Sequence, residues 1–413
     1  MNKVKLGEVL DVKRGASLSG DYYSESGEKI RLTLGNFDYP NGGFKENTSK
    51  SDIYFTGEVK PEFILKKGDI ITPLTEQVAG LLGETARIPE DDLYIQSGDV
   101  GLVIPNESKL DNKYAYYLLA SPLIKRQLGA AAQQTKIRHT SPDKIKDCEA
   151  WLPSLEYQKK AGELLDDINF KIKCNNKINA ELESMAKTIY DYWFLQFEFP
   201  NEDGKPYKSS GGKMVWNEEL KREIPEGWST TTIGDITICH DSERIPLSGK
   251  DRENMVGDIP YYGATDIMGY VDKPIFDGDY VLLAEDGSVM DEEGHPILQR
   301  VTGRVWVNNH AHVLEPIKKH SCKLLMMFLK DVYVPMIKTG SIQMKINQEN
   351  MNGITVPNIP DDLKEKINLE LCTIEKKQLQ IIAENQELTS LRDFLLPMLM
   401  NGQVGFKINN RKE

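Results

Sequence analysis

The sequence predicts an α+β protein made of two tandem globular copies and two long helices, with one helix after each copy. Three observations lead to this fold class: similar short phrases recur at a slowly drifting offset, two long stretches lack helix breakers, and short β-rich runs are bounded by turns. The chain has 413 residues, of which 39% are hydrophobic and 28% charged. That is an ordinary globular composition, and the length suits two or three domains.

The recurring phrases indicate a tandem duplication. Each copy opens with a strand-like segment that ends in a Gly-acid turn, and each later contains a second Gly-Asp before a β-rich run. The matching segments are 4–9 with 231–236, 67–71 with 277–281, 135–138 with 344–347, and 151–155 with 355–359. The offset falls from 227 to 204 residues, as expected for two copies whose loops differ in length. We therefore expect globular copies at residues 1–153 and 226–358.

A long helix is predicted after each copy, over residues 154–198 and 359–402. In the first, Gly162 is the only glycine or proline for most of its length, and apolar residues recur at steps of mostly three and four. This spacing is typical of a coiled-coil seam, and Asn175 is a polar interruption that could set its register. A helix of about 39 residues would be roughly 58 Å long and needs a partner. We expect the two helices to pair antiparallel.

Within each copy the sequence predicts short strands and shorter helices without a regular βαβ alternation. The β-rich runs, such as 70–72, 280–283 and 305–307, are bounded by Gly, Asp and Pro, and helical patterns follow at 113–129 and 322–336. This arrangement favours an α+β fold. The remaining segments are a polar, Gly-rich linker at 199–225 and a tail at 403–413.

The composition argues against membrane and secreted proteins. No apolar run is long enough to cross a bilayer, and no apolar segment follows the N-terminal Met-Asn-Lys-Val-Lys, so we expect a cytoplasmic protein with no membrane partner. The five cysteines are widely spaced and contain no Cys-x-x-Cys pair. A disulfide framework or a thiolate zinc site is therefore not expected.

The sequence contains none of the common catalytic motifs. It has no Gly-x-Gly, no P-loop, no Pro-Pro of the kind found in adenine methyltransferases, no Gly-x-Ser-x-Gly and no His-Glu-x-x-His. His310 and His312 alternate on a predicted strand with no third ligand nearby in sequence, which favours a hydrogen-bonding role over a metal site. The acidic residues 285–286 and 291–293 could hold a cation, but they are interpreted as an exposed acidic loop. No catalytic and no metal-binding residues are predicted.

Several phrases of the chain resemble those of a known family. They lie at 184–196 with Tyr192-Trp193-Phe194, at 204–212, at 215–220 running into Ile224-Pro225-Glu226-Gly227-Trp228, at 259–264, at 305–314, and at 391–399 with Leu391-Arg392-Asp393-Phe394. On these segments the chain resembles the specificity (DNA-recognition) subunit of type I restriction–modification systems. The resemblance spans essentially the whole chain and is least evident in the first copy, as expected if that part differs with the DNA sequence read.

The resemblance implies a division of labour along the chain. Residues 1–153 and 226–358 would be two target-recognition domains, each reading half of a split site in double-stranded DNA. The paired helices would be spacers that set the distance between the halves in a pseudo-two-fold arrangement. They would also dock two methyltransferase subunits, with restriction/translocase subunits outside them. By itself such a subunit is not an enzyme and holds no cofactor; S-adenosylmethionine, ATP and Mg would be bound by the partner subunits.

The distribution of charge bears on how the chain would bind DNA. Its formal net charge is −12. Residues 1–153 carry 20 basic and 22 acidic side chains, and residues 226–358 carry 12 basic and 19 acidic ones. Neither copy is basic, and phosphate binding depends on clustered Lys and Arg. A lone chain is therefore expected to bind DNA poorly, with partner subunits supplying much of the phosphate contact.

Polar and basic side chains suited to reading base edges gather in a few segments. Gln and Asn match the adenine edge, and Arg and Lys match guanine. Two stretches are expected to be equivalent through the duplication, namely those around Lys136-Ile137 and Lys345-Ile346. The candidate DNA-contacting residues are Lys13, Arg14, Arg31, Asn36, Gln77, Gln133, Gln134, Lys136, Arg138 and His139 in the first copy, and Tyr262, Thr265, Ser288, Ser341, Gln343, Lys345 and Asn347 in the second.

Two other functions remain open at this point. The negative charge would suit a two-headed protein-interaction scaffold whose helices hold partners together without DNA specificity. The chain could also be the specificity region of an enzyme that carries methylation and recognition together, although one copy would suffice there. Sequence-selective DNA binding in the presence of methyltransferase subunits separates a recognition subunit from a scaffold.

Overall fold

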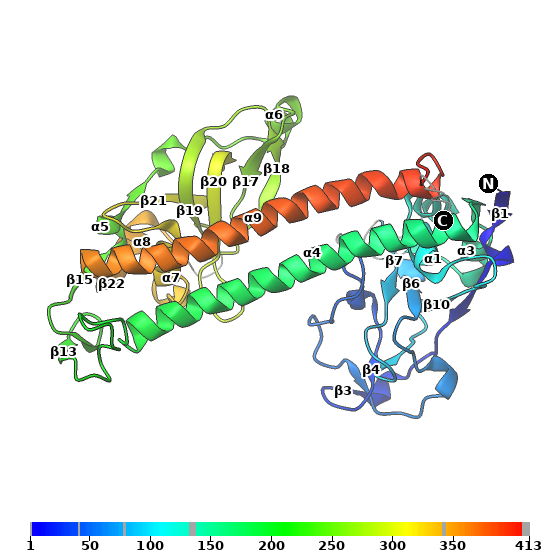
Figure 1. Cartoon of the computed structure of the whole chain (residues 1–413), viewed down its shortest axis with the longest axis horizontal. Coiled ribbons are helices and arrows are strands. Elements are labelled where there is room, and N and C mark those ends of the chain that lie inside the picture. The colour runs from blue at the N-terminus through cyan, green and yellow to red at the C-terminus, as the bar shows by residue number, and fades with distance from the viewer. Residues whose placement is uncertain (1, 40–41, 77–79, 132–137, 341–343, 407–413) are drawn as a thin grey trace, which may run out of the picture. The chain divides into compact units, whose positions relative to one another are not determined.

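A computed structural model describes residues 2–39, 42–76, 80–131, 138–340 and 344–406 of the chain. The chain divides into two compact units: unit 1 comprises residues 1–175 and 383–413, and unit 2 comprises residues 176–382. Each unit holds one globular copy and part of both long helices, which Figure 1 draws in green and in orange to red. The mixture of strands and helices agrees with the predicted α+β class.

The globular part of unit 1 is built on a four-stranded antiparallel sheet. Its strands, in spatial order, are β2 (Leu10–Arg14), β10 (Val100–Pro105), β6 (Ile70–Pro73) and β8 (Ala86–Arg87). Every residue of β6 is buried. Ile70 and Ile71 point to opposite faces and pack into two different hydrophobic clusters. Both faces of the sheet are therefore covered at this strand.

The described part of unit 1 also contains shorter strands and short α-helices. The strands are β1 (Asn2–Lys5), β3 (Tyr23–Ser24), β4 (Ile30–Arg31), β5 (Tyr54–Phe55), β7 (Thr75–Glu76), β9 (Tyr94–Ile95), β11 (Arg138–His139) and β12 (Glu149–Leu152). The helices are α1 (Asn112–Leu119), α2 (Pro122–Ala131) and α3 (Pro142–Lys146). Asp111 caps α1 by accepting a hydrogen bond from the Tyr114 amide, so α1 begins where the sequence supplies this acceptor.

Unit 2 contains a longer version of the same sheet. Its strands, in spatial order, are β16 (Thr237–Cys239), β21 (Ala311–Pro316), β19 (Phe276–Ala284), β20 (Leu298–Val307), β17 (Ile259–Tyr262) and β18 (Ile267–Val271). The other strands are β13 (Met214–Asn217), β14 (Arg222–Pro225), β15 (Ser229–Thr232) and β22 (Thr355–Asn358). The shorter helices are α5 (Ile233–Ile236), α6 (Gly249–Asn254), α7 (Cys322–Leu329) and α8 (Gln348–Asn352).

The two sheets share strand order and register, which confirms the predicted duplication. Val103 pairs with Val12 and Ile70 in unit 1, and Leu314 pairs with Cys239 and Val281 in unit 2. These pairs relate the copies by an offset of 227 residues on the first strand and 211 on the next two. The hydrogen-bonding pattern therefore fixes residue-by-residue equivalence where the sequences have diverged.

The entry to each copy and its exit into the long helix are also duplicated. β1 pairs antiparallel with β12, with Lys5 opposite Glu149, and β15 pairs with β22, with Thr232 opposite Thr355. The exit strands are related by an offset of 206 residues. In both copies, therefore, the strand that enters the domain lies beside the strand that leads into the following helix.

The two long helices are α4 (Leu155–Tyr190) and α9 (Asp361–Met400), and a π-helical turn at Asp191–Leu195 follows α4. Within each unit, part of α4 lies against part of α9 (Figure 1). The paired positions descend along α9 as they ascend along α4, so the helices are antiparallel. The hydrogen-bonded pairs are Tyr157 with Leu399 and Asn169 with Arg392 in unit 1, and Asn179 with Gln378 in unit 2.

Gly162 has a packing role in α4. A Cβ atom at this position would lie 2.8 Å from the Cβ of Lys113 and 3.0 Å from the Tyr114 amide nitrogen. Because real side chains do not tolerate such contacts, the glycine lets α4 approach the start of α1 closely. Its presence in an otherwise glycine-free helix is explained by this contact and not by a break in the helix.

Candidate functional site

In unit 1, two segments predicted to contact DNA form one short antiparallel ribbon. Arg138 of β11 pairs with Glu76 of β7, and His139 pairs with Thr75. The carboxylate of the buried Glu76 accepts hydrogen bonds from the amides of Gly80, at 3.1 Å, and Leu82, at 3.0 Å. The ribbon is therefore anchored to the loop that follows β7. His139, at its outer end, is exposed.

Unit 2 forms the equivalent ribbon from different residues. Asp286 and Lys345 make an antiparallel bridge, and the Ile346 amide donates to the Glu285 carbonyl at 2.9 Å. The matching bond in unit 1 runs from the Thr140 amide to the Leu74 carbonyl at 2.8 Å. His139 and Lys345 therefore occupy the same place in the two copies.

This pairing corrects the equivalence predicted from sequence. The prediction aligned Lys136-Ile137 with Lys345-Ile346, which is three residues out of register, because the observed offset is 206 residues. The counterpart of Ile346 in the first copy is Thr140, and both residues are buried. A Lys-Ile dipeptide can occur at similar places in both copies by chance, whereas backbone hydrogen bonds decide which residues are structurally equivalent.

Lys345 is held by a buried carboxylate. Its Nζ lies 2.8 Å from Oε1 of Glu285, and Nη1 of Arg244 donates to Oε2 of the same carboxylate at 2.6 Å. Burial opposes the ionisation of Glu285, but the hydrogen bonds from Lys345 and Arg244 outweigh it and lower the pKa of Glu285. The same bond raises the pKa of Lys345. Lys345 is therefore a fixed positive charge on the ribbon.

The buried state of Glu285 overturns the interpretation of residues 285–286 as an exposed loop. Glu285 is only 8% exposed and is the first residue after β19, where the chain meets the segment that contains Ile346. An acidic dipeptide alone gives no indication of such a partner, because Arg244 and Lys345 lie far from it in sequence. Glu285 and Arg244 are the network residues that sequence reasoning missed.

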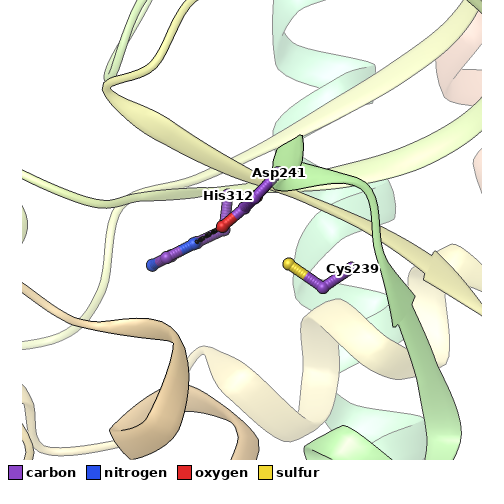
Figure 2. Close-up of side chains that lie close together, drawn as sticks. All are labelled: Cys239, Asp241 and His312. Carbon is purple, nitrogen blue, oxygen red and sulfur yellow. Dashed lines mark hydrogen bonds and ion pairs between the residues drawn. The ribbon is translucent and has the colours of Figure 1, made fainter. Parts of the chain in front are cut away.

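Cys239, Asp241 and His312 lie next to this network (Figure 2). One potential ligand atom from each lies within 4.8 Å of the others. However, Nδ1 of His312 is 2.5 Å from the Asp241 carboxylate, and its Nε2 is 2.9 Å from the Ile346 carbonyl. Burial raises the pKa of Cys239 to about 12, so near neutral pH it is a thiol and a poor metal ligand. Both ring nitrogens of His312 thus serve the protein's own hydrogen bonds.

The hydrogen bonds of His312 connect the ribbon to the sheet. Asp241 follows β16, His312 lies on β21, and Ile346 belongs to the ribbon. His310 bonds in the same manner to Asp286, with its Nδ1 2.6 Å from the carboxylate. The hydrogen-bonding interpretation of the two histidines is confirmed. Their arrangement holds the Lys345 segment in place.

Two of the candidate DNA-contacting residues are buried and held by partners within unit 1. Arg31 is buried, donates three hydrogen bonds to Asp52 and stacks over the Tyr23 ring at 3.8 Å. Asn36 is buried, and its side chain bonds to the Thr33 amide and to the Lys45 carbonyl. Base contacts would require both side chains to give up these partners, and their contact with DNA stays a prediction. Neither set of partners could be predicted from the sequence. Arg31 depends on Asp52, 21 residues away, and Asn36 depends on the cap of a short helical turn and on Lys45.

The other candidates fall into three groups. Exposed or half-buried ones are Lys13 and Arg14 on β2, Tyr262 at the end of β17, Thr265 and Ser288. Asn347 is half-buried, and its Oδ1 caps α8 by accepting from the Asn350 amide at 2.7 Å. Outside the described residues lie Gln77, Gln133, Gln134, Lys136, Ser341 and Gln343; the backbone of Arg138 is described, but its side chain is not.

Among the helices of the described part of the chain, no membrane-spanning candidate is found, since none combines the necessary length with sufficient apolar character.

A protein-family comparison matches most of the chain. The family described as "Type I restriction modification DNA specificity domain" matches residues 1–184 and again residues 225–388. The two matches fall on the two globular copies and extend into the following helices. They reproduce the duplication seen in the strand register.

Individual proteins give the same picture. The chain is 24% identical over 321 residues to the type I restriction enzyme MjaIX specificity subunit of Methanocaldococcus jannaschii, covering 73% of this chain and 71% of that protein. A putative type I restriction enzyme specificity subunit of Haemophilus influenzae is 32% identical over 136 residues, covering 33% of this chain and 34% of that protein. The crystal structure of a type I restriction–modification system S subunit from M. genitalium matches with a TM-score of 0.60 and 18% identity, covering 97% of this chain and 96% of that one. That structural likeness supports the fold.

Proposed function

The chain belongs to the family of type I restriction–modification DNA specificity subunits, and we propose that its two globular copies each read one half of a bipartite site in double-stranded DNA. The family assignment itself implies DNA sequence recognition. The bipartite reading is our inference from the duplication. The two half-sites are expected to differ in sequence, because equivalent positions such as His139 and Lys345 carry different side chains.

One observation supports this proposal most directly. Both units build the same sheet register and place an equivalent two-segment ribbon at the same position relative to it. In each copy the ribbon carries an exposed polar or basic residue, His139 or Lys345, beside a buried glutamate. A duplicated scaffold with divergent exposed residues is the arrangement expected of two readers with different targets.

We further propose that α4 and α9 are the docking surface for two methyltransferase subunits. Both helices leave large apolar side chains exposed to solvent, a feature that marks interaction surfaces. In unit 1 these are Phe170, Leu391 and Phe394, and in unit 2 they are Ile178, Met185, Leu369 and Ile382. Restriction/translocase subunits would join outside the methyltransferases. S-adenosylmethionine, ATP and Mg would be bound by these partners, and this chain would act in the cytoplasm by binding, without catalysis of its own.

The charge distribution supports a role for partners in DNA binding. Residues 226–358 carry 12 basic and 19 acidic side chains, so this copy repels phosphates overall. Within it, Lys345 and Arg244 are already paired with Glu285. Base-edge contacts from the ribbons would therefore depend on basic surfaces of the methyltransferase subunits to hold the DNA backbone.

Methylation mapping tests the proposal. The chain would be expressed with its cognate methyltransferase subunit in cells without other DNA methylation, and modified positions would be mapped across the genome. We expect one split motif of two unlike halves. Replacing residues 1–153 with the corresponding domain of a relative should change one half and leave the other intact, and replacing residues 226–358 should change only the second half.

The control is the methyltransferase subunit expressed alone, which should give no motif. The negative charge of the second copy favours one other function, a protein-interaction scaffold without DNA specificity. A complex that forms fully yet methylates no defined motif would contradict DNA reading and support that scaffold.

A further inference from the structure

In unit 1, an arginine on the sheet edge binds a carboxylate on the long helix. Nη1 of Arg87, on β8, donates to Oδ1 of Asp166, on α4, at 2.8 Å. The guanidinium also lies over the Tyr116 ring, with its central carbon 4.2 Å from the ring centroid. Tyr117 donates its hydroxyl hydrogen to the same Asp166 oxygen at 2.7 Å. The contact is partly buried on both sides, so it is more than a solvated surface pair.

In unit 2, an arginine on the corresponding strand binds a carboxylate on the other long helix. Nε of Arg300, on β20, donates to Oε1 of Glu375, on α9, at 2.8 Å. Nη2 of the same guanidinium donates to Asp279 at 2.7 Å. The side chains of Arg300 and Glu375 are only 15% and 12% exposed. The arginine is thereby fixed between its own sheet and the helix.

Strand register shows that the two arginines are equivalent. Arg87 pairs with Ile70 of β6, and Arg300 pairs with Val281 of β19. Ile70 and Val281 are equivalent because each pairs with the matching residue of the neighbouring strand, Val103 or Leu314. The family resemblance does not identify this pair, and the surrounding sequences differ. The equivalence of Arg87 and Arg300 follows from the strand pairing alone.

In each copy a second basic residue also contacts the long helices. Lys113 and Lys323 are both the second residue of eight-residue helices, α1 and α7. Nζ of Lys113 lies 3.7 Å from Asp166. Lys323 is buried and binds Glu183 of α4, and its Nζ also donates to Gln378 of α9 at 3.3 Å. Each globular copy therefore contacts acidic residues of the helices through one arginine and one lysine at matching positions.

We infer that Arg87 and Arg300 are a matched pair of positioning residues that set the orientation of each globular copy on its helix, and thereby the gap between the two DNA half-sites. This inference rests on the proposed bipartite function. Each planar guanidinium donates one directional hydrogen bond to its helix carboxylate and is also held by its own copy, Arg87 by the Tyr116 ring and Arg300 by Asp279, so it restricts rotation of the copy on the helix. A specificity subunit needs this restriction, because a domain that rotates would accept half-sites at several separations.

The experiment uses the complete complex of the chain with its cognate methyltransferase subunit. Methylated positions would be mapped genome-wide for the unaltered chain, Arg87→Gln, Arg300→Gln and the double variant. We expect both half-site sequences to persist, and sites whose gap is one base pair longer or shorter to gain methylation several-fold over the unaltered chain. Two matched controls are Arg304→Gln, an exposed arginine on the same strand β20, and Lys67→Gln, an exposed residue just before β6. Both controls should keep a single gap.

Each outcome bears on the inference separately from the proposed function. If the unaltered chain gives no split motif, the bipartite function fails. If it gives one, and the arginine variants only lower methylation equally at every site, the inference is overturned and the arginines are merely stabilising. Should the glutamine variants fail to assemble, Arg87→Lys and Arg300→Lys would be tested in their place. These variants keep the positive charge but lose the planar guanidinium with its several N–H donors. A single unchanged gap in both folded lysine variants would also overturn it.

Discussion

Asn175 of α4 donates from Nδ2 to Oδ1 of Asn385 on α9 at 2.9 Å, and to Oε2 of the adjacent Glu384 at 2.8 Å. Asn175 is almost completely buried, and buried polar groups almost always have hydrogen-bond partners, as this amide does. Apolar seams between helices can slide by a turn, whereas a buried amide is satisfied in one alignment. This contact selects one alignment of the two helices in unit 1.

Substitution of Asn175 by alanine should destabilise the chain. The change removes the two hydrogen bonds that Asn175 donates to α9, each worth about 0.5–1.5 kcal/mol. Urea denaturation measures the free energy of unfolding of each variant. The control is Lys177→Ala, at an exposed position of the same helix, which should change this free energy by close to zero. An Asn175→Ala variant as stable as the unaltered chain would show that the contact does not contribute.

Two leucines of α9 should respond very differently to truncation. Leu371 is completely buried in the core of unit 2, whereas Leu369, two residues earlier, is 71% exposed. Leu371→Ala should lower the free energy of unfolding by about 2–5 kcal/mol through lost burial and a residual cavity. Leu369→Ala should change it by less than about 0.5 kcal/mol. Equal effects of the two changes in chemical denaturation would contradict the assigned helix face.

The exposed phenylalanine of α4 should matter for assembly and not for folding. Phe170 is 69% exposed in unit 1. We expect Phe170→Ser to weaken binding of the methyltransferase subunit by about 2 kcal/mol, roughly 30-fold in Kd, as for an apolar anchor of an interface. Calorimetric titration measures the affinity, and Lys173→Ser, an exposed polar position of the same helix, is the control. Unchanged affinity in Phe170→Ser would place the docking surface elsewhere.

Lys345 should affect DNA binding in one half-site only. If its ammonium contacts DNA in the assembled complex, Lys345→Gln should reduce the slope of log affinity against log salt by about one. The second half-site should also become less selective, while the first is unchanged. Titration of the complex with duplexes carrying either altered half-site measures both effects. Lys273→Gln, an exposed lysine before β19, should leave the slope unchanged; an equal effect there would indicate a general charge effect.

His240 should make the stability of unit 2 depend on pH. Burial lowers the pKa of His240, but hydrogen bonds to Glu243, at 2.6 Å, and Glu315, at 2.8 Å, outweigh burial and raise it. Because the folded-state pKa exceeds the unfolded value of about 6.5, the stabilisation is complete below that pH and is lost as pH rises through the folded-state pKa. His240→Gln should flatten this fall in the free energy of unfolding.

His320 is the matched control for that pH dependence. Burial lowers the pKa of His320, so its contribution has the opposite sign. It is present above the unfolded pKa and is lost as pH falls through the folded-state value. Denaturation curves between pH 5 and 8.5 give the free energy of unfolding at each pH. Its fall with rising pH should disappear in His240→Gln and persist in His320→Gln. An unchanged alkaline loss in His240→Gln would assign it to another group.

The periodic and repeated features of the fold were predictable from sequence. Duplicated phrases identified the two copies, and apolar steps of three and four identified α4 and α9 with Asn175 as the polar position in their seam. These signals are local or self-similar, so they survive in a single sequence. The interpretation of His310 and His312 as hydrogen-bonding residues also followed from a local absence of further ligands.

The candidate site was much less predictable. Lys136 and Lys345 looked equivalent, yet the strand pairing within each copy makes His139 the counterpart of Lys345. Arg31 and Asn36 were predicted to contact bases, and nothing in the sequence indicated that loop residues engage both side chains inside unit 1. Glu285 looked solvated, yet Arg244 and Lys345 neutralise it. In each case the answer depends on a partner that is distant in sequence or on the register of strand pairing. Neither can be inferred from the type of residue at one position.

The sequence by itself determined that this chain is a duplicated α+β protein with two long helices, because repetition and helical periodicity are properties of neighbouring residues. Tertiary structure alone decided which residues of the two copies correspond. Register depends on hydrogen bonds between segments as far apart as β7 and β11, and a shift of a few residues leaves composition unchanged. The same long-range pairing decided that Arg87 and Arg300 are counterparts and that each meets an acidic residue of a long helix.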